Sequence, residues 1–254
     1  MPLPGTIHGE NDPFAPTQWT VILAAGRSQA NPEVAQAALG QLCQTYWAPL
    51  YTFVRSRGSS PYDAQDLTQS FFAYLIEHKI YARADRQRGK FRSFLLASLK
   101  NFLSDSRDRE QALKRGGGRD FLPLNEEQAT EAESLYQTHG GSDGENADDR
   151  IFERSWAEML VNAGLERAAA DYKKEGKAKL FAELKIFLTV GAEPLPTYEQ
   201  LAAQIGMPAS TLRSHVTRLR ARYREALRAE VRRTVATESE VDGELRELLR
   251  VLRS

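Results

Sequence analysis

The chain has few residues of the kinds that bind metals or cross membranes. It contains one cysteine, Cys43, which excludes an internal disulfide and a cysteine-based metal site, and its four histidines are scattered. No stretch approaches the roughly 20 apolar residues of a membrane-spanning helix. The start also lacks the charged and then apolar segments of a signal peptide. We therefore expect a cytoplasmic protein with no metal, no other cofactor and no membrane partner.

An excess of one charge is also lacking, because 34 Lys and Arg balance 34 Asp and Glu. A net charge of zero argues against a protein that coats DNA over its whole surface, so nucleic-acid binding should involve one face. No glycine-rich phosphate loop, nucleophile motif or metal-ligand spacing is present. The clustered acids and histidine that remain (Asp63, Asp66, Glu77 and His78) follow the spacing of a helix surface. These absences indicate a protein that is not an enzyme.

What the sequence does contain is apolar residues at helical spacing, without credible strand patterns. It predicts an all-α protein with two helical domains joined by a flexible linker, the second containing a helix-turn-helix, and 254 residues suffice for two modest cores. In chain order we predict a disordered tail over residues 1–16, a helical domain over 17–113, a flexible acidic linker over 114–149, a second helical domain over 150–236 and a helical extension over 237–254.

The linker prediction rests on composition, since residues 114–149 combine a glycine run with many acids. Such polar segments are flexible. The acids would keep the chain soluble; a second interpretation is that they mimic phosphate and shield a basic surface before DNA binds. The extension over 237–254 would fold back on the second domain or form a partner surface.

Two helices of the first domain have clear start signals. Asn31 precedes Pro32, and Ser60 precedes Pro61. A capping side chain followed by a proline in the first turn favours a helix start. A further amphipathic helix follows a basic joint over residues 80–89.

The segment over residues 196–235 has the pattern of two helices joined by a tight turn. Thr197 and Gln200 have the spacing of a capping box. Gly206 supplies the left-handed residue that ends a helix. Pro208 suits the first turn of the next helix, because its fixed φ is helical.

The second of these helices has a single apolar stripe, made of Leu212, Val216, Leu219, Tyr223 and Leu227, and is otherwise polar and rich in arginine. This pattern is typical of a DNA-reading helix-turn-helix, and the arginine excess suits phosphate binding. The alternative is an ordinary helical hairpin with a solvated surface. The candidates for DNA contact are Ser210, Thr211, Arg213, Ser214, Thr217 and Arg218.

Two separated segments resemble one family. DAQDLTQSFFAYLIE (63–77), followed by GKFRSFLLASLKNFLSD (89–105), resembles region 2 of bacterial RNA polymerase sigma factors of the sigma-70 family, extracytoplasmic-function type. YEQLAAQIGMPASTLRSHVTRLRARYRE (198–225) is similar to region 4 of that family. The order and spacing of the segments agree with the family.

The resemblance implies a non-catalytic subunit that binds core RNA polymerase, recognises promoter DNA and helps to melt it. By analogy, the helix that begins at Pro61 would bind polymerase through Asp63, Gln65, Asp66 and Gln69. The next helix would contact the promoter element nearer the start site through Arg88, Lys90, Arg92, Lys100 and Asn101. The helix-turn-helix candidates would contact the more distant element, at bases or at phosphates.

One departure from the family concerns the acidic motif, where Gln65 and Ser70 stand at positions that often carry acids. A phosphate would restore the lost charge, since it adds roughly −1.5 to −2 charges. The candidate acceptors are Ser59, Ser60, Thr68 and Ser70. The alternative is that Asp63 and Asp66 suffice. The resemblance thus leaves an anti-sigma factor and a Ser/Thr kinase open as further partners.

Two other functions fit the same residues. One is a helix-turn-helix regulator that binds operator DNA as a dimer without polymerase. The other is a degenerate sigma-like interaction protein that sequesters another factor, which a weakened acidic motif would favour.

Overall fold

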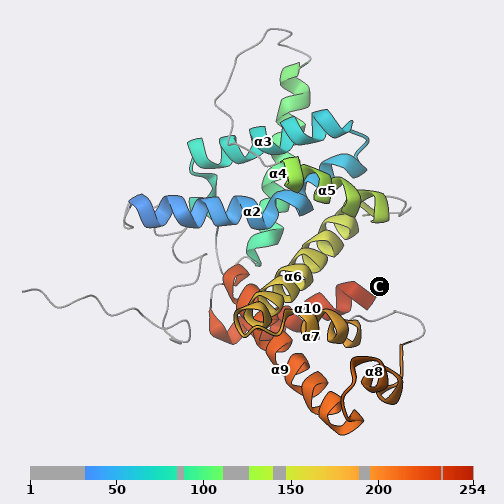
Figure 1. Cartoon of the computed structure of the whole chain (residues 1–254). Coiled ribbons are helices and arrows are strands. Elements are labelled where there is room, and N and C mark those ends of the chain that lie inside the picture. Colours follow the sequence, from blue (N-terminus) through green and yellow to red (C-terminus); the bar gives the residue numbers. More distant parts are fainter. Residues whose placement is uncertain are drawn as a thin grey trace, which may run out of the picture. The chain divides into compact units, whose positions relative to one another are not determined.

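The computed structural model describes residues 32–84, 89–110, 126–139, 147–188, 195–235 and 237–253 (Figure 1). Over these ranges all regular structure is helical and no strand occurs, which confirms the predicted all-α class. The tail predicted over residues 1–16 and the candidate Arg88 lie outside the described residues.

The internal contacts divide the chain into two compact units. The first unit comprises Met1–Met159 with Arg232–Ser254, and the second comprises Leu160–Val231. The helices that lie wholly in the first unit are α2 (Pro32–Ser56), α3 (Pro61–Glu77), η1 (Ile80–Arg83), α4 (Phe91–Glu110), α5 (Glu126–His139), η4 (Glu238–Glu240) and α10 (Val241–Arg253). Those of the second unit are α7 (Ala178–Leu184), η3 (Lys185–Phe187) and α8 (Tyr198–Ile205). Two helices, α6 (Ala147–Lys174) and α9 (Ala209–Thr234), contribute residues to both units.

The start of α3 has the predicted capping geometry. The hydroxyl of Ser60 accepts a hydrogen bond from the backbone N–H of Asp63 at 3.2 Å, and Pro61 occupies the first turn. The cap satisfies an amide that has no partner within the helix, and Asp63 lies where the helix dipole favours a negative charge. Gly58, which precedes this start, has a φ of +88°, so the end of α2 uses a conformation that suits glycine.

Aromatic side chains build the core of the first unit. Figure 1 shows α2 and α3 side by side, and their Trp47 and Phe72 stack with ring centroids 6.2 Å apart. The ring centroids of Phe71 and Phe102 of α4 lie 5.7 Å apart. Fully burying a side chain of this size contributes roughly 1.5–3 kcal/mol. This core fixes the direction in which α3 and α4 present their polar faces.

The segment predicted as a flexible acidic linker contains a packed helix. Helix α5 packs against α2, and its Ala132 is fully buried. Its Glu133 receives two hydrogen bonds from Arg55, both at 2.8 Å, and one from the hydroxyl of Tyr51 at 2.6 Å. Acidity and glycine content favour a linker here, whereas the spacing of Ala132, Leu135 and Tyr136 marks a narrow apolar stripe that a helix can bury.

The second unit has its own apolar core. It joins Tyr172 of α6, Phe181 of α7, Leu201 of α8 and the predicted α9 stripe residues Leu212, Val216 and Leu219. Farther along α9, the predicted stripe residue Leu227 is only half-buried, and the preceding residue, Ala226, is buried in its place. The buried side of the helix therefore lies one residue earlier than predicted at this point.

The α8–α9 pair has the predicted local geometry. The Thr197 hydroxyl accepts from the Gln200 N–H at 3.1 Å, and the Gln200 side chain accepts from the Thr197 N–H at 2.8 Å, which confirms the capping box. Gly206 adopts φ 77° and ψ 36°, the left-handed conformation expected at this end. Pro208 accepts the first α9 backbone bond, from Leu212.

The extension forms α10 and belongs to the first unit. Val241, Leu248 and Val251 are buried, whereas Leu249 is 48% exposed. Of the apolar residues in this helix, Leu249 therefore lies on the outer face.

Candidate nucleic-acid interface

The first half of α9 presents a continuous polar face. Ser210, Thr211, Arg213, Ser214, Thr217 and Arg218 are all exposed. Their positions repeat at intervals of three and four, so they lie on one side of the helix, opposite the buried stripe. The Ser214 hydroxyl donates to the Ser210 carbonyl at 3.1 Å, and the Thr217 hydroxyl donates to the Arg213 carbonyl at 3.0 Å. Each hydroxyl thus uses its proton within the helix. Its oxygen can still accept a hydrogen bond from a partner, since both residues are exposed.

Arg213 is held in place by an exposed ion pair. Its Nη2 lies 2.6 Å from Oε1 of Glu199 on α8, and both side chains are more than half exposed. Exposed pairs contribute only about 0.2–1 kcal/mol. A phosphate oxygen can therefore replace Glu199 at small cost.

Farther along α9, two arginines contact the body of the second unit. Arg222 pairs with Glu175 at 2.6 Å and lies over the Tyr172 ring at 5.0 Å. Arg220 donates to the Phe187 carbonyl at 3.4 Å. These contacts hold the α9 surface on its core, and Arg224 is exposed beyond them.

The acidic candidates lie near the start of α3. Asp63 and Asp66 are exposed, whereas Gln65 and Gln69 are half-buried. Tyr62, which sequence reasoning missed, is 83% exposed beside them. Tyr62, Asp66 and Gln69 are spaced four and three residues apart, so they lie on one face of the helix. This spacing is the signal in the sequence that would have identified Tyr62.

The four candidate phosphate acceptors differ in accessibility. Thr68 is fully buried, and its hydroxyl donates to the Ala64 carbonyl at 2.7 Å. Ser59 and Ser70 are half-buried, and of the four only Ser60 is exposed. A kinase would reach Thr68 only after local unfolding of α3.

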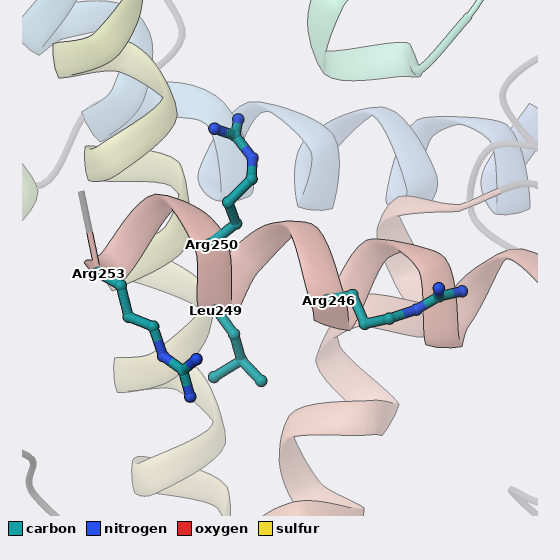
Figure 2. A pocket seen from close by; sticks show the side chains of 4 residues that line it. All are labelled: Arg246, Leu249, Arg250 and Arg253. Carbon is teal, nitrogen blue, oxygen red and sulfur yellow. The ribbon is translucent and has the colours of Figure 1, made fainter.

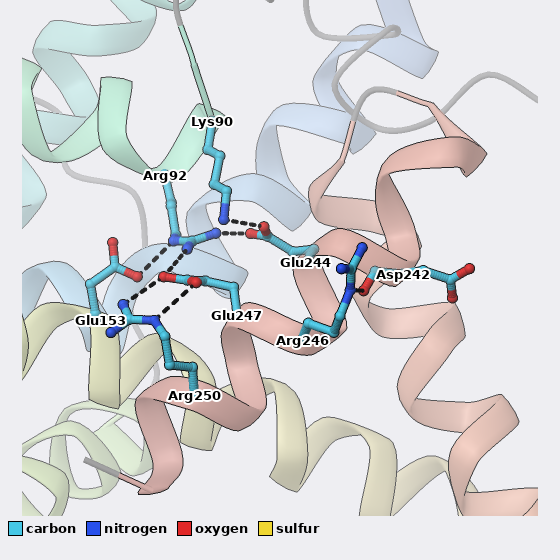
Figure 3. A network of polar contacts seen from close by, with 8 residues as sticks. All are labelled: Lys90, Arg92, Glu153, Asp242, Glu244, Arg246, Glu247 and Arg250. Atoms are coloured by element: carbon cyan, nitrogen blue, oxygen red, sulfur yellow. Dashed lines mark hydrogen bonds and ion pairs between the residues drawn. The ribbon is translucent and has the colours of Figure 1, made fainter.

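The basic candidates of α4 meet carboxylates at its N-terminal end (Figure 3). Arg92 pairs through Nε with Glu153 of α6 at 2.7 Å, and its Nη1 contacts Glu244 of α10. Its Nη2 lies 4.0 Å from Glu247. Lys90 Nζ lies 2.8 Å from the other oxygen of Glu244. We call these five residues the α4–α10 charge cluster.

Burial sets the properties of this cluster. Arg92 is 3% exposed, and its guanidinium lies 3.9 Å from the centre of the Trp156 ring. The pKa of Lys90 is lowered, first by burial and then by the Arg92 charge. The pKa of Glu247 is lowered, first by its hydrogen bond from Arg250. Arg92, expected on a DNA-facing rim, thus lies under α10 because that helix brings carboxylates to it.

The remaining two α4 candidates lie a little more than two turns beyond Arg92 along the helix. Lys100 pairs with Asp149 of α6 at 2.6 Å, and both side chains are more than a third exposed. Asn101 is exposed. Asp149 belongs to the predicted acidic linker, so at least one of its acids does contact a basic candidate.

Other kinds of site have little support in the described ranges. No group of three His, Cys, Asp or Glu residues gathers there in a way that could hold a metal ion. Burial raises the pKa of the Cys43 thiol to about 12, so the thiolate form is disfavoured. No described helix combines the length and apolar character needed to cross a membrane.

Comparison with known proteins finds no match: no family model, no curated protein and no solved structure corresponds to this chain.

Proposed function

We propose that this protein is a sigma factor, which binds core RNA polymerase and directs promoter recognition, melting and transcription initiation. The observation that carries the proposal is the exposed polar face at the start of α9, next to the capped helix α8 and the Gly206 turn. In this proposal the pair α8–α9 is a helix-turn-helix, and α9 enters the major groove.

On this proposal each candidate on α9 has a physical role. Arg213 and Arg218 bind guanine edges or phosphates, and Ser210 and Thr211 lie in the first turn, which approaches the groove first. The adjacent hydroxyls of Ser214 and Thr217 serve as acceptors or turn to donate to phosphate oxygens.

The exposed acids of α3 supply the polymerase contact in this proposal. Asp63 and Asp66 place two negative charges within one turn, and charge complementarity with a basic surface speeds association and fixes orientation. Tyr62 adds an exposed aromatic ring of the type enriched at binding hot spots.

Co-purification with core RNA polymerase tests the polymerase contact. The natural chain is expected to bind as a single copy. An Asp63→Asn/Asp66→Asn variant is expected to bind on the order of tenfold more weakly, since two negative charges are removed from the binding surface. Glu77→Gln, at the other end of α3, is the control, and the single variants Asp63→Asn and Asp66→Asn are its charge-matched counterparts. Tight DNA binding by a dimer without any polymerase association would favour the operator-binding regulator instead.

A sequestering interaction protein gives a third pattern. It would bind another transcription factor and neither polymerase nor DNA. The same experiment, repeated with labelled duplex DNA in place of polymerase, separates these outcomes.

A further inference from the structure

The inner face of α10 is acidic where it meets α4. Glu244 is 5% exposed and uses both of its oxygens, one toward Lys90 and one toward Arg92. Glu247 lies one turn farther along and approaches Arg92 from the same side (Figure 3). Two carboxylates of one terminal helix therefore converge on the two cations at the N-terminal end of α4.

Carboxylates and phosphates compete for the same cations. A guanidinium binds either anion through paired N–H donors, and an ammonium binds either one as a point charge. Lys90 and Arg92 cannot contact a DNA backbone through the donors that Glu244 now occupies. Occupation of this end of α4 by α10 and by DNA is therefore mutually exclusive.

We propose that α10 is a displaceable acidic cover, which competes with DNA phosphates for Lys90 and Arg92. The proposal rests on the proposed function, because it assigns regulation to the α4 surface through which the protein would contact promoter DNA. With the cover closed, α9 and the accessible α4 candidates Lys100 and Asn101 remain available, and Arg92 does not. With the cover open, both surfaces bind DNA.

The construction of α10 suits a cover that detaches. It is 13 residues long, and a helix of this length has marginal stability in water without packing. Three buried apolar residues anchor it, namely Val241, Leu248 and Val251. Leu245 and Leu252 are half-buried beside them. Opening must overcome this apolar contact and the ion pairs of Glu244, and DNA phosphates replace the ion pairs.

The outer face of α10 carries the opposite charge. Arg246, Arg250 and Arg253 line an open hollow together with the exposed Leu249 (Figure 2). The Lys90 side chain is itself 45% exposed, so approaching DNA meets positive charge on the cover and on Lys90 while Arg92 is still buried. This electrostatic attraction raises the local concentration of DNA near the protein while α10 is still packed on Lys90 and Arg92.

The test is a salt titration of binding to a fluorescently labelled duplex DNA, with no polymerase present. A Glu244→Gln/Glu247→Gln variant is expected to bind on the order of tenfold tighter, because the open fraction rises. Its salt dependence should steepen by about 0.9 for each additional phosphate that the protein neutralises. Asp242→Asn, which removes one charge from the same helix away from Lys90 and Arg92, is the control, and the single variant Glu244→Gln is its charge-matched counterpart. Adding Lys90→Ala to the double variant should cancel part of the increase in affinity.

Hydrogen exchange of the natural chain supplies a readout that no substitution can disturb. The α10 amides are expected to be protected in the free protein and to lose protection when DNA binds. Two results together would contradict the proposal: α10 amides that stay protected in the DNA complex, and a double variant that binds DNA no more tightly than the Asp242→Asn control. In that case α10 stays packed against α4 and does not compete with DNA.

The two proposals fail in different ways. Absence of polymerase binding with intact DNA binding contradicts the sigma-factor proposal and leaves the competition measurable. DNA binding that depends on α9 and ignores the α10 substitutions contradicts only the cover. A chain that binds DNA neither alone nor together with core polymerase contradicts both.

Discussion

At the scale of residues, Arg92 and Arg213 show how surroundings decide what a guanidinium does. Arg213 pairs with one carboxylate that is itself well exposed to solvent, so exchange for phosphate costs little. Arg92 lies between a tryptophan ring and three carboxylates at 3% exposure. Breaking a buried pair of this kind by removing one partner costs about 3–5 kcal/mol. On the proposals above, Arg92 can bind a DNA phosphate only after α10 has moved.

A residue-scale prediction concerns Glu133, which joins α5 to α2. Its pKa is lowered, first by the hydrogen bonds from Arg55. A carboxyl whose folded pKa is depressed contributes stability that is present above its unfolded value, ordinarily 4.5, and is lost as pH falls through the folded value. Glu133→Gln is expected to lower the free energy of unfolding by about 1.5–3 kcal/mol near neutral pH.

Denaturant unfolding followed by tryptophan fluorescence measures this effect, since Trp47 and Trp156 lie in the first unit. The gap between the natural chain and the variant should close as pH falls below 4.5. Glu131→Gln, an exposed neighbour on α5, should leave the free energy of unfolding unchanged. A gap that stays constant through the acid range would show that the ion pair does not stabilise the fold.

At the scale of elements, α6 and α9 approach each other closely inside the second unit. A Cβ added at Gly164 would lie 3.2 Å from the Leu227 Cα, tighter than ordinary contact. Gly164→Ala is expected to destabilise the second unit by about 1–3 kcal/mol, because backbone atoms cannot turn aside as a side chain can. Thermal unfolding followed by circular dichroism measures the change.

Gly243 on α10 provides the matched control, because its added Cβ would meet no atom within 4 Å. There, the same substitution should stabilise the helix by about 0.5–1 kcal/mol. Equal effects at the two glycines would contradict the close α6–α9 approach.

The polar face of α9 gives a second prediction at this scale. Arg218→Ala is expected to weaken promoter binding and to lower the salt slope by about 0.9 if Arg218 binds phosphate. Lys174→Ala, an exposed cation of the same unit, is the control. Core-polymerase binding should be unchanged in both. Equal DNA binding by the two variants would place the interface elsewhere.

Local features were predictable from the sequence, and tertiary ones were not. The capping box at Thr197, the cap at Ser60 and the turn at Gly206 depend on neighbours within a few residues, so the pattern sufficed. Helix α5 was missed because its apolar stripe is short and its surroundings are acidic. The burial of Arg92 depends on Glu244, which is distant in sequence, so no local pattern indicates it.

At the scale of the whole molecule, a net charge of zero conceals separate charged surfaces. Acids are exposed at the start of α3, and a basic face is exposed on α9. A sigma factor needs both, because one surface must bind the polymerase while the other binds DNA. If the two surfaces act separately, substitutions on α3 should leave DNA binding unchanged, and substitutions on α9 should leave polymerase binding unchanged.

Run-off transcription with core RNA polymerase on a library of promoter fragments tests the sigma-factor proposal most directly. The natural chain is expected to direct initiation from a subset that shares one sequence pattern, and Arg218→Ala should reduce that signal. Failure of the folded natural chain to direct initiation from any fragment, under conditions where it binds DNA, would contradict the proposal.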